Sequence, residues 1–347
     1  MSQPTVLAVD GNSLLHRAFH ASARSGFRLH GRPAWAVRGL LSQLVAAVDR
    51  VCADAVVVGF DDRGNSSRKR RWPTYKAHRV PKPETLESQL DLAVDVLRAL
   101  GVVVVVPPGL EADDVLASVA AQAPALGART VVATSDRDSF SLVGEHTRML
   151  RILNGGVDAS PLLDPARLAM VTGVRPEQYP DLAALRGDAS DNLPGVSGFG
   201  AKTAVRLLTE LDSAEAAFAD ALAGGERCRT AVGAARARTL ATSEARERYD
   251  LNRAVMTMVT TAELGLDLTP GSGTGVLPLD EETVRAVFTR FELHVPAAIR
   301  ALTLQEPTRS VEPTYVDPRW SAAPSPRFAP LPPLVPSGPS YVQETLF

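Results

Sequence analysis

The chain has 347 residues, of which 45% are hydrophobic, so it is long enough for one large domain or two smaller ones with an apolar core. A net charge of −2 does not indicate a nucleic-acid partner, so any basic surface must be local. Two cysteines exclude a disulfide framework and a zinc cluster, and no stretch is typical of a signal peptide or a membrane span, which predicts a cytoplasmic protein.

Short apolar runs predict the strands of a central sheet. The expected strands are residues 5–9, 55–60, 102–106, 130–134 and 148–153, and the expected helices are 14–21, 35–51, 84–100 and one that begins near residue 111. Apolar strands that alternate with helices are typical of an α/β fold with a mostly parallel sheet covered on both faces. Ligands bind such sheets at the carboxyl ends of the strands.

Acidic residues gather at these carboxyl ends. The acids at the strand–helix junctions are Asp10, Asp61, Glu111, Asp113, Asp114, Asp136 and Asp138. Any one of them is also explained as a helix cap, a turn residue or a favourable charge at a helix N-terminus. Together they predict a site for Mg²⁺ or Mn²⁺, because crowded carboxylates repel one another unless they are protonated or bridged by a cation.

A basic segment follows the second strand. Residues 63–82 contain eight lysines and arginines and no acid, with Trp72 and Tyr75 interleaved. Charge combined with stacking rings is typical of a surface that binds single-stranded nucleic acid, although a solvated basic loop has the same composition. Because the segment begins next to Asp61, we expect it to lie over the acids.

The pattern changes near residue 160. Alanine-rich helical segments run from about 165 to 300 without convincing strands, and they include a second acidic pair, Asp188 and Asp191. The glycine-rich stretch 194–200 precedes a helix that begins near Ala201, which suits a phosphate, although a plain helix–helix turn is the alternative. Beyond Glu306 the chain is rich in proline and serine, which predicts a disordered tail.

These motifs, in this order, resemble the 5′–3′ exonuclease and flap endonuclease family, best known as the N-terminal exonuclease domain of bacterial DNA polymerase I. The resemblance covers roughly residues 4–300 and rests on residues 7–12, 59–61, 75–79, 111–114, 136–138 and 187–192 with the glycine-rich hairpin after them. No polymerase domain follows, so the chain resembles a stand-alone version of this domain.

The resemblance implies a three-part organisation. Residues 1–165 would form a PIN-like nuclease core with a basic helical arch at about 63–100, and residues 166–305 a helical region with a helix–three-turn–helix motif at about 185–210. Residues 306–347 would be the tail. One metal group would comprise Asp10, Asp61, Glu111, Asp113 and Asp114, and the second would comprise Asp136, Asp138, Asp188 and Asp191.

The resemblance also assigns roles in DNA handling. Tyr75 would clamp the 5′ single strand, while Lys76 and Arg68 would polarise the scissile phosphate. The hairpin would hold duplex phosphates around a monovalent cation such as K⁺. The expected DNA-binding residues are Arg70, Arg71, Arg79, Gly195, Val196, Ser197, Gly198, Gly200, Lys202 and Thr203.

The last five residues resemble the peptide by which bacterial replication and repair proteins bind the sliding clamp. Gln343 would make polar contacts while Leu346 and Phe347 fill an apolar pocket, although so short a motif also arises by chance.

The expected function is hydrolysis of phosphodiesters at 5′ ends and flaps of DNA, and of RNA primers in RNA–DNA hybrids, to leave 5′-phosphates. This chemistry belongs to replication and repair, in a nucleoid-associated cytoplasmic enzyme. Two alternatives remain at this point: a metal nuclease that acts mainly on RNA, and a non-catalytic protein that binds DNA junctions.

Overall fold

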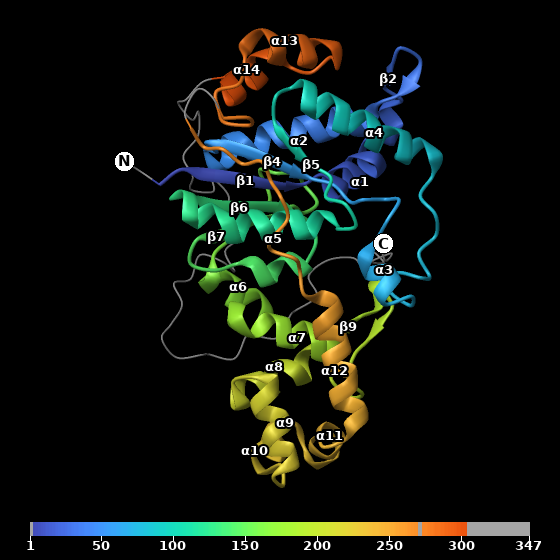
Figure 1. Ribbon diagram of the computed structural model, residues 1–347, viewed down its shortest axis with the longest axis vertical. Coiled ribbons are helices and arrows are strands. Elements are labelled where there is room, and N and C mark those ends of the chain that lie inside the picture. Colours follow the sequence, from blue (N-terminus) through green and yellow to red (C-terminus); the bar gives the residue numbers. More distant parts are fainter. Residues whose placement is uncertain (1–2, 270–272, 304–347) are drawn as a thin grey trace.

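A computed structural model describes residues 3–269 and 273–303 (Figure 1). Its main feature is a six-stranded sheet in the order β5-β4-β1-β6-β7-β8. The strands are β1 (Thr5–Asp10), β4 (Ala55–Gly59), β5 (Val103–Val105), β6 (Arg129–Thr134), β7 (Thr147–Arg151) and β8 (Leu162–Leu163). All neighbours are parallel except β7 and β8, so the predicted mostly parallel sheet is confirmed.

The sheet is covered by helices on both faces (Figure 1). On one face lie α1 (Gly11–Ser22), α2 (Trp35–Val51) and α4 (Glu84–Ala99), and on the other lies α5 (Ala112–Gln122). Successive strand residues point to opposite faces, and accordingly Leu7 and Val9 pack in the first core while Val6 and Ala8 pack in the second. This double cover explains why every residue of β1 is buried.

A helical body follows the sheet and has a second apolar core, which it shares with Phe140, Met149 and Leu163 of the sheet domain. Its helices are α6 (Pro165–Thr172), α7 (Tyr179–Arg186), α8 (Ala201–Leu211), α9 (Ala214–Leu222), α10 (Glu226–Val232), α11 (Ala234–Leu240) and α12 (Ser243–Met256). The expectation that strands are absent after residue 160 is wrong, because β8 closes the sheet and β9 (Gly187–Asp188) pairs with β10 (Leu193–Pro194). These strands are two residues long, which is too short to give a periodic signal.

The segment over the carboxyl edge of the sheet is shorter than the arch expected at about 63–100. It contains one short helix, α3 (Ser67–Arg71), before α4 begins at Glu84. Leu86, Leu90 and Leu97 of α4 are buried in the core with α2, so this helix covers the sheet. The part free to cover the acids is therefore residues 63–83, which we call the basic segment.

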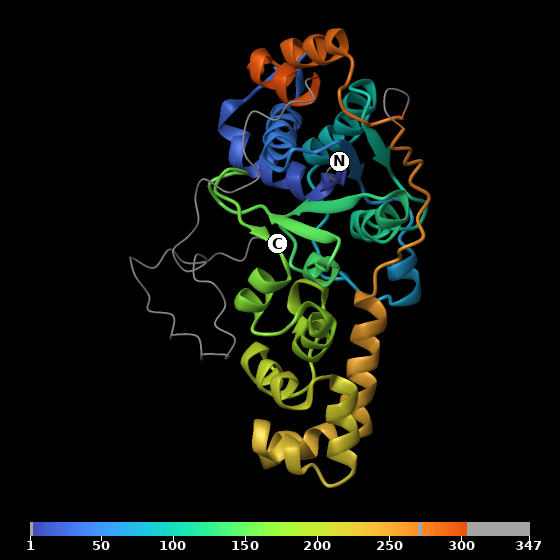
Figure 2. The ribbon, with the colours of Figure 1, turned by 90° about the vertical axis from the view of Figure 1, so that its left-hand side faces the viewer.

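After α12 the chain returns to the sheet. The return segment, residues 257–269 and 273–279, runs along the side of the core toward α13 (Glu281–Arg290) and α14 (Val295–Thr303) (Figure 2). It is tied to β4, where Val56 N donates to Gly275 O at 2.9 Å. Phe288 and Phe291 of this last part are buried in the same core as α2. The expected helical region 166–305 is thus divided, since its end belongs to the α/β core.

Several short elements complete the described chain. They are η1 (Ala23–Ser25), β2 (Arg28–Leu29), β3 (Arg32–Pro33), η2 (Ala123–Leu126), η3 (Asp138–Leu142), η4 (Pro176–Gln178) and η5 (Ala189–Asp191). In the parts of the chain that the structure describes, none of the helices has the length and apolarity needed to cross a bilayer. The expected tail, with Gln343, Leu346 and Phe347, lies outside the described residues.

Candidate active site

Strand ends place two acids at the middle of the carboxyl edge. Asp10 ends β1 and caps α1, accepting hydrogen bonds from Ser13 N and from the Thr134 hydroxyl, each at 2.8 Å. Asp61 follows β4 and accepts a hydrogen bond from Ala112 N at 2.9 Å. The adjacent Asp62 instead accepts from Gly109 N, at 2.8 Å, and thereby anchors the loop before α5. Neighbouring backbone thus fixes both Asp10 and Asp61 at the edge.

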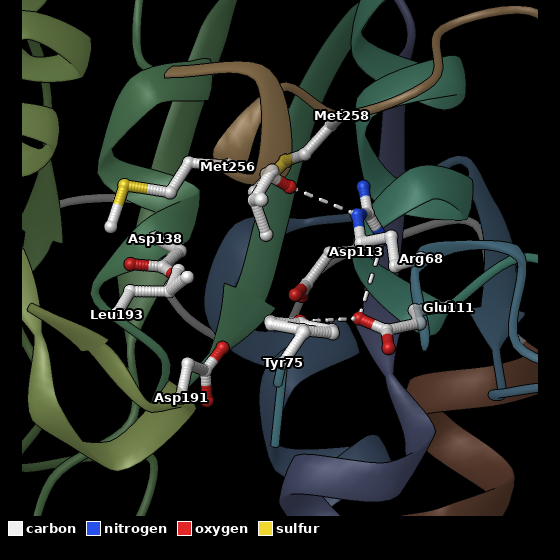
Figure 3. A pocket seen from close by; sticks show the side chains of 10 residues that line it. Arg68, Tyr75, Glu111, Asp113, Asp138, Asp191, Leu193, Met256 and Met258 are labelled. Carbon is white, nitrogen blue, oxygen red and sulfur yellow. Dashed lines mark hydrogen bonds and ion pairs between the residues drawn. The ribbon is translucent and has the colours of Figure 1, made fainter. Parts of the chain in front are cut away.

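Glu111 lies at the centre of a set of cations and donors. Its Oε2 is 3.0 Å from the Tyr75 hydroxyl and 3.3 Å from Arg68 Nη1 (Figure 3). It is also 3.0 Å from Lys76 Nζ. Burial opposes the charged form of Glu111, but Lys76 and Arg68 outweigh it and lower the pKa of this carboxyl. Glu111 therefore stays ionised, and it draws the three predicted catalytic residues together.

Asp113 points into a small cavity that is shared with the helical body. The cavity also touches Asp138 and Asp191, and Met256 and Met258 close it from the end of α12 (Figure 3). Burial, followed by the charges of Asp136, Asp10 and Asp138, raises the pKa of Asp113 well above its ordinary value. The simultaneous ionisation of the carboxylates in this cavity is therefore energetically unfavourable without a cation.

The same crowding affects acids on both sides of this cavity. Burial, with the nearby Asp61 and Asp136 charges, raises the pKa of Asp10 to about 7. Burial, with Asp136, Asp188 and Asp191, raises the pKa of Asp138 to about 8. Burial raises the pKa of Asp191 too, against the lowering effect of Lys76 and Arg79. The acids of the sheet edge and of the helical body are therefore one electrostatic cluster.

A lysine of the protein itself lies between the two acidic groups. Lys76 Nζ is 3.0 Å from Glu111 and 3.8 Å from Asp191. In this arrangement, with Lys76 between the acids, the side chains do not form a ready metal site. Within residues 3–269 and 273–303, no group of three or more His, Cys, Asp and Glu residues is arranged to hold a metal ion. The donor set nevertheless fits a hard cation, because it consists of carboxylate oxygens that already attract a compact ammonium.

Asp114 differs from its neighbours and faces away from the cavity. It is fully buried and accepts hydrogen bonds from both terminal nitrogens of Arg68, from Glu111 N and from Val259 N. These four bonds use the lone pairs of both oxygens. Asp114 is also the third helical residue of a capping box with Glu111. The sequence predicted that Asp114 is a metal ligand, whereas in the structure Asp114 orients Arg68.

The basic segment is held to the helical body by several hydrogen bonds. Arg68 donates to the Val255 and Thr257 carbonyls at 3.2 Å, and Lys76 N donates to Asp191 O at 3.0 Å. Arg79 forms an ion pair with Asp191. By contrast, Arg70 and Arg71 are exposed, and the Arg71 guanidinium lies 4.8 Å from the centre of the Trp72 ring.

The glycine-rich hairpin joins β10 to α8. A Cβ at Gly195 would lie 2.1 Å from the carbonyl oxygen of Arg186, so only glycine allows this close approach of the backbone. Lys202 and the backbone of Ser197, Gly198 and Gly200 are exposed, whereas Thr203 is half-buried. Val196 is buried, and its N–H donates to Leu185 O at 2.9 Å, so this residue supports the hairpin from within and does not offer a free amide to DNA. No side chain caps the N-terminus of α8, which leaves backbone N–H groups for a phosphate.

Sequence reasoning missed the residues that hold this arrangement together. Thr134 fixes Asp10, and its place as the last residue of β6 beside β1 was a usable signal. Asn252 is fully buried and donates to the Ala184 and Pro194 carbonyls, each at 2.9 Å, which holds α12 against the hairpin. The carbonyls of Val255 and Thr257 gave no signal, because any residue can supply a backbone oxygen.

Comparison with known proteins gives two family matches. Residues 5–170 match the 5′-3′ exonuclease, N-terminal resolvase-like domain, and residues 174–274 match the 5′-3′ exonuclease, C-terminal SAM fold. DNA polymerase I of Mycobacterium tuberculosis is 39% identical over 213 residues, which are 61% of this chain and 24% of that protein. DNA polymerase I of Chloroflexus aurantiacus is 33% identical over 317 residues, covering 88% of this chain and 32% of that protein. The chain spans about a quarter to a third of the length of these curated relatives.

Solved structures share the fold. T5 5′-exonuclease with divalent metal ions (zinc) bound superposes with a TM-score of 0.60 at 18% identity, covering 87% of this chain and 100% of that one. The catalytic core of Rad2 in complex with DNA substrate gives a TM-score of 0.53 at 16% identity, covering 86% and 92% of the two chains. At these identities the similarity establishes a common fold, with a mostly parallel sheet and a helical body beside its carboxyl edge.

Proposed function

We propose a function from the fact that the chain belongs to the 5′–3′ exonuclease family. In this proposal it is a divalent-metal-dependent nuclease that hydrolyses phosphodiesters at 5′ ends and 5′ flaps of DNA. One observation carries the proposal. Carboxylates from the sheet edge and from the helical body, whose pKa values are raised by burial and then by one another's charge, lie beneath a segment with eight basic residues. This combination is suited to binding cations and a polyanion at the same place.

The metal-binding residues in this proposal form two groups. The first comprises Asp10, Asp61, Glu111 and Asp113, and the second comprises Asp136, Asp138, Asp188 and Asp191. Oxygen ligands favour Mg²⁺ or Mn²⁺. Bound there, such ions supply an activated water and stabilise charge on the phosphate. Asp114 is the exception to the set implied by the family resemblance, since its hydrogen bonds are already used to hold Arg68.

The basic segment would act on the scissile phosphate. Lys76 is held by Glu111 and Asp191, and cations bound by these acids would free its ammonium for the phosphate oxygens. Arg68 is fixed by Asp114 and by two carbonyls, so its guanidinium needs little reorganisation. Tyr75 is held by Glu111 and is buried, so the half-buried Trp72 beside it is the ring on which an unpaired base could stack.

The hairpin would hold the duplex next to the cleaved bond. Its exposed amides, the uncapped N-terminus of α8 and Lys202 suit phosphates of the duplex backbone, with a K⁺ ion as an additional contact. RNA primers in RNA–DNA hybrids are the second substrate class in this proposal. The products are 5′-phosphates. We also propose that residues 343–347 bind the sliding clamp, and that the enzyme works at the nucleoid in the cytoplasm.

The test uses a 5′-labelled flap, a blunt duplex and a plain RNA strand, each with and without Mg²⁺. We expect cleavage of both DNA substrates only with the metal, and loss of that cleavage with retained DNA binding in Asp113→Ala. Preferential cleavage of the plain RNA would instead indicate an RNA nuclease. Tight binding to the flap without cleavage under any divalent metal would indicate a non-catalytic junction binder.

A further inference from the structure

A groove beside the acidic cluster shares Asp61 and Arg63 with the site described above, but its apolar wall has no part in the function proposed there. It has a volume of about 350 Å³ and lies between α4 and the carboxyl ends of β4 and β5. Its apolar wall is formed by Phe60, Leu90, Val94 and Val106. The volume is in the range of small-molecule sites and more than ten times the share of one water molecule, so a planar ring fits.

The apolar wall is fixed rather than adaptable. Phe60 is 3% exposed, and its ring lies so close to Gly11 that a Cβ there would come within 2.4 Å of it. Leu90 and Val94 lie one turn apart on α4, which is packed into the core. Val106 is 37% exposed at the end of the edge strand β5. A preformed apolar surface of this kind favours a rigid, flat ligand.

Asn12 is one of the residues that line the groove. Its Nδ2 is buried and has no hydrogen-bond partner among the described residues, so a turn of the side chain is needed to bring this donor to the groove surface. A buried donor in that state is costly, so it calls for an acceptor such as the carbonyl oxygen or ring nitrogen of a nucleobase. Asp95, which also lines the groove, could accept from an exocyclic amine.

The topology places the groove on a particular side of the acids. Along the carboxyl edge the order is the helical body with its hairpin, then β6 with Asp136, β1 with Asp10, β4 with Asp61 and finally β5 with Val106. A nucleic-acid strand that leaves a duplex at the hairpin and crosses the acids therefore reaches the groove next. That side of the cleaved phosphate is the unpaired 5′ side.

We propose that this groove binds the base of the unpaired nucleotide immediately 5′ to the phosphate that is cleaved. The proposal rests on the proposed function and adds a subsite to it. Arg63, at the mouth of the groove and paired with Asp91, would lie near the phosphate of the same nucleotide. The subsite explains why the wall is apolar, and a bound base would give the turned Asn12 amide a hydrogen-bond partner.

The test compares two flap substrates that differ only at this nucleotide, one with a normal base and one abasic. We expect the wild-type protein to cleave the abasic flap with kcat/KM about tenfold lower, since one stacked or buried base typically contributes that much. Val94→Trp fills the groove and should lose a similar factor on the normal flap, with no further loss on the abasic one. Leu222→Trp, on an exposed apolar residue of α9, is the matched control and should behave as wild type.

A measurement on the unmodified protein makes the result independent of how the variant folds. 2-Aminopurine at the same nucleotide should be protected from acrylamide quenching several-fold when the flap is bound in EDTA. Equal cleavage of the two flaps by the wild-type protein, or unprotected 2-aminopurine, overturns the subsite. Failure of the wild-type protein to cleave the normal flap would instead overturn the proposed function, so the two outcomes are distinct.

Discussion

Replacing Asp10 by Asn should stabilise the metal-free protein, and the gain should grow with pH. The pKa of this carboxyl is raised from 3.8 to about 7 in the folded protein. Between these values the folded state binds a proton that the unfolded state has lost, so stability falls as pH rises through this window. About three units at 1.36 kcal/mol each give roughly 4 kcal/mol lost at pH 8, about 1.6 kcal/mol at pH 5 and essentially nothing at pH 3.

Asparagine removes this cost while keeping most of the local structure. It caps a helix as well as aspartate does, and its oxygen can still accept from Ser13 N. The Thr134 hydroxyl must turn to accept from the new amide, for which we deduct about 1 kcal/mol. The net expectation is a gain of roughly 2–3 kcal/mol at pH 8 and about 0–1 kcal/mol at pH 5.

Thermal unfolding in EDTA at pH 5 and pH 8 measures this difference. The control is Asp54→Asn, because Asp54 accepts from Thr5 N at the opposite end of β1 and lies away from the acids. That variant should show no gain at either pH. A lower melting temperature for Asp10→Asn at pH 8, or the same change at both pH values, would refute the crowding on which the metal site rests.

Three further predictions concern other parts of the site. Asp113→Asn should leave the metal-free protein as stable or more stable. Asp114→Asn should cost about 3 kcal/mol, because it removes the bidentate carboxylate of a largely buried guanidinium and leaves it only the weaker contact with Glu111; equal melting temperatures of the two variants in EDTA would contradict this. Lys76→Ala should slow single-turnover cleavage more than it weakens binding, whereas Lys202→Ala should weaken binding and flatten its salt dependence; equal effects at saturating enzyme would refute the division. Deleting residues 343–347 should abolish clamp binding in a calorimetric titration and leave cleavage of free flaps unchanged, and a truncated protein that binds equally well would exclude the tail.

The sheet and its acidic edge were predictable because their signals are local. Each strand is an unbroken apolar run, and each junction acid follows directly in the sequence, so the parallel topology alone brings them to one edge. The different roles of Asp113 and Asp114 were not predictable. Adjacent helical residues point about 100° apart, and which one faces the cavity depends on where Arg68 and Val259 lie.

The return of the chain to the core was hidden for a similar reason. The return segment has no periodicity, and its contacts join residues far apart, as between Gln122 and the Thr260 and Ala262 carbonyls. The helices α13 and α14 carry ordinary amphipathic patterns, which fit either part of the molecule. The packing of α14 against α2 and of α13 against α4 is decided by contacts across more than half of the chain.

This return also has a consequence for how the protein folds. The first core contains α2 near one end of the sequence and Phe288 and Phe291 near the other, so it is incomplete until the whole helical body has been synthesised. During translation the part of α2 that packs against α14 therefore stays uncovered until the end, and a fragment that stops at residue 165 would leave that part exposed. Contacts at such long sequence separation also slow folding. The core of the helical body, by contrast, contains no residue beyond α12, so it can form as soon as α12 has emerged.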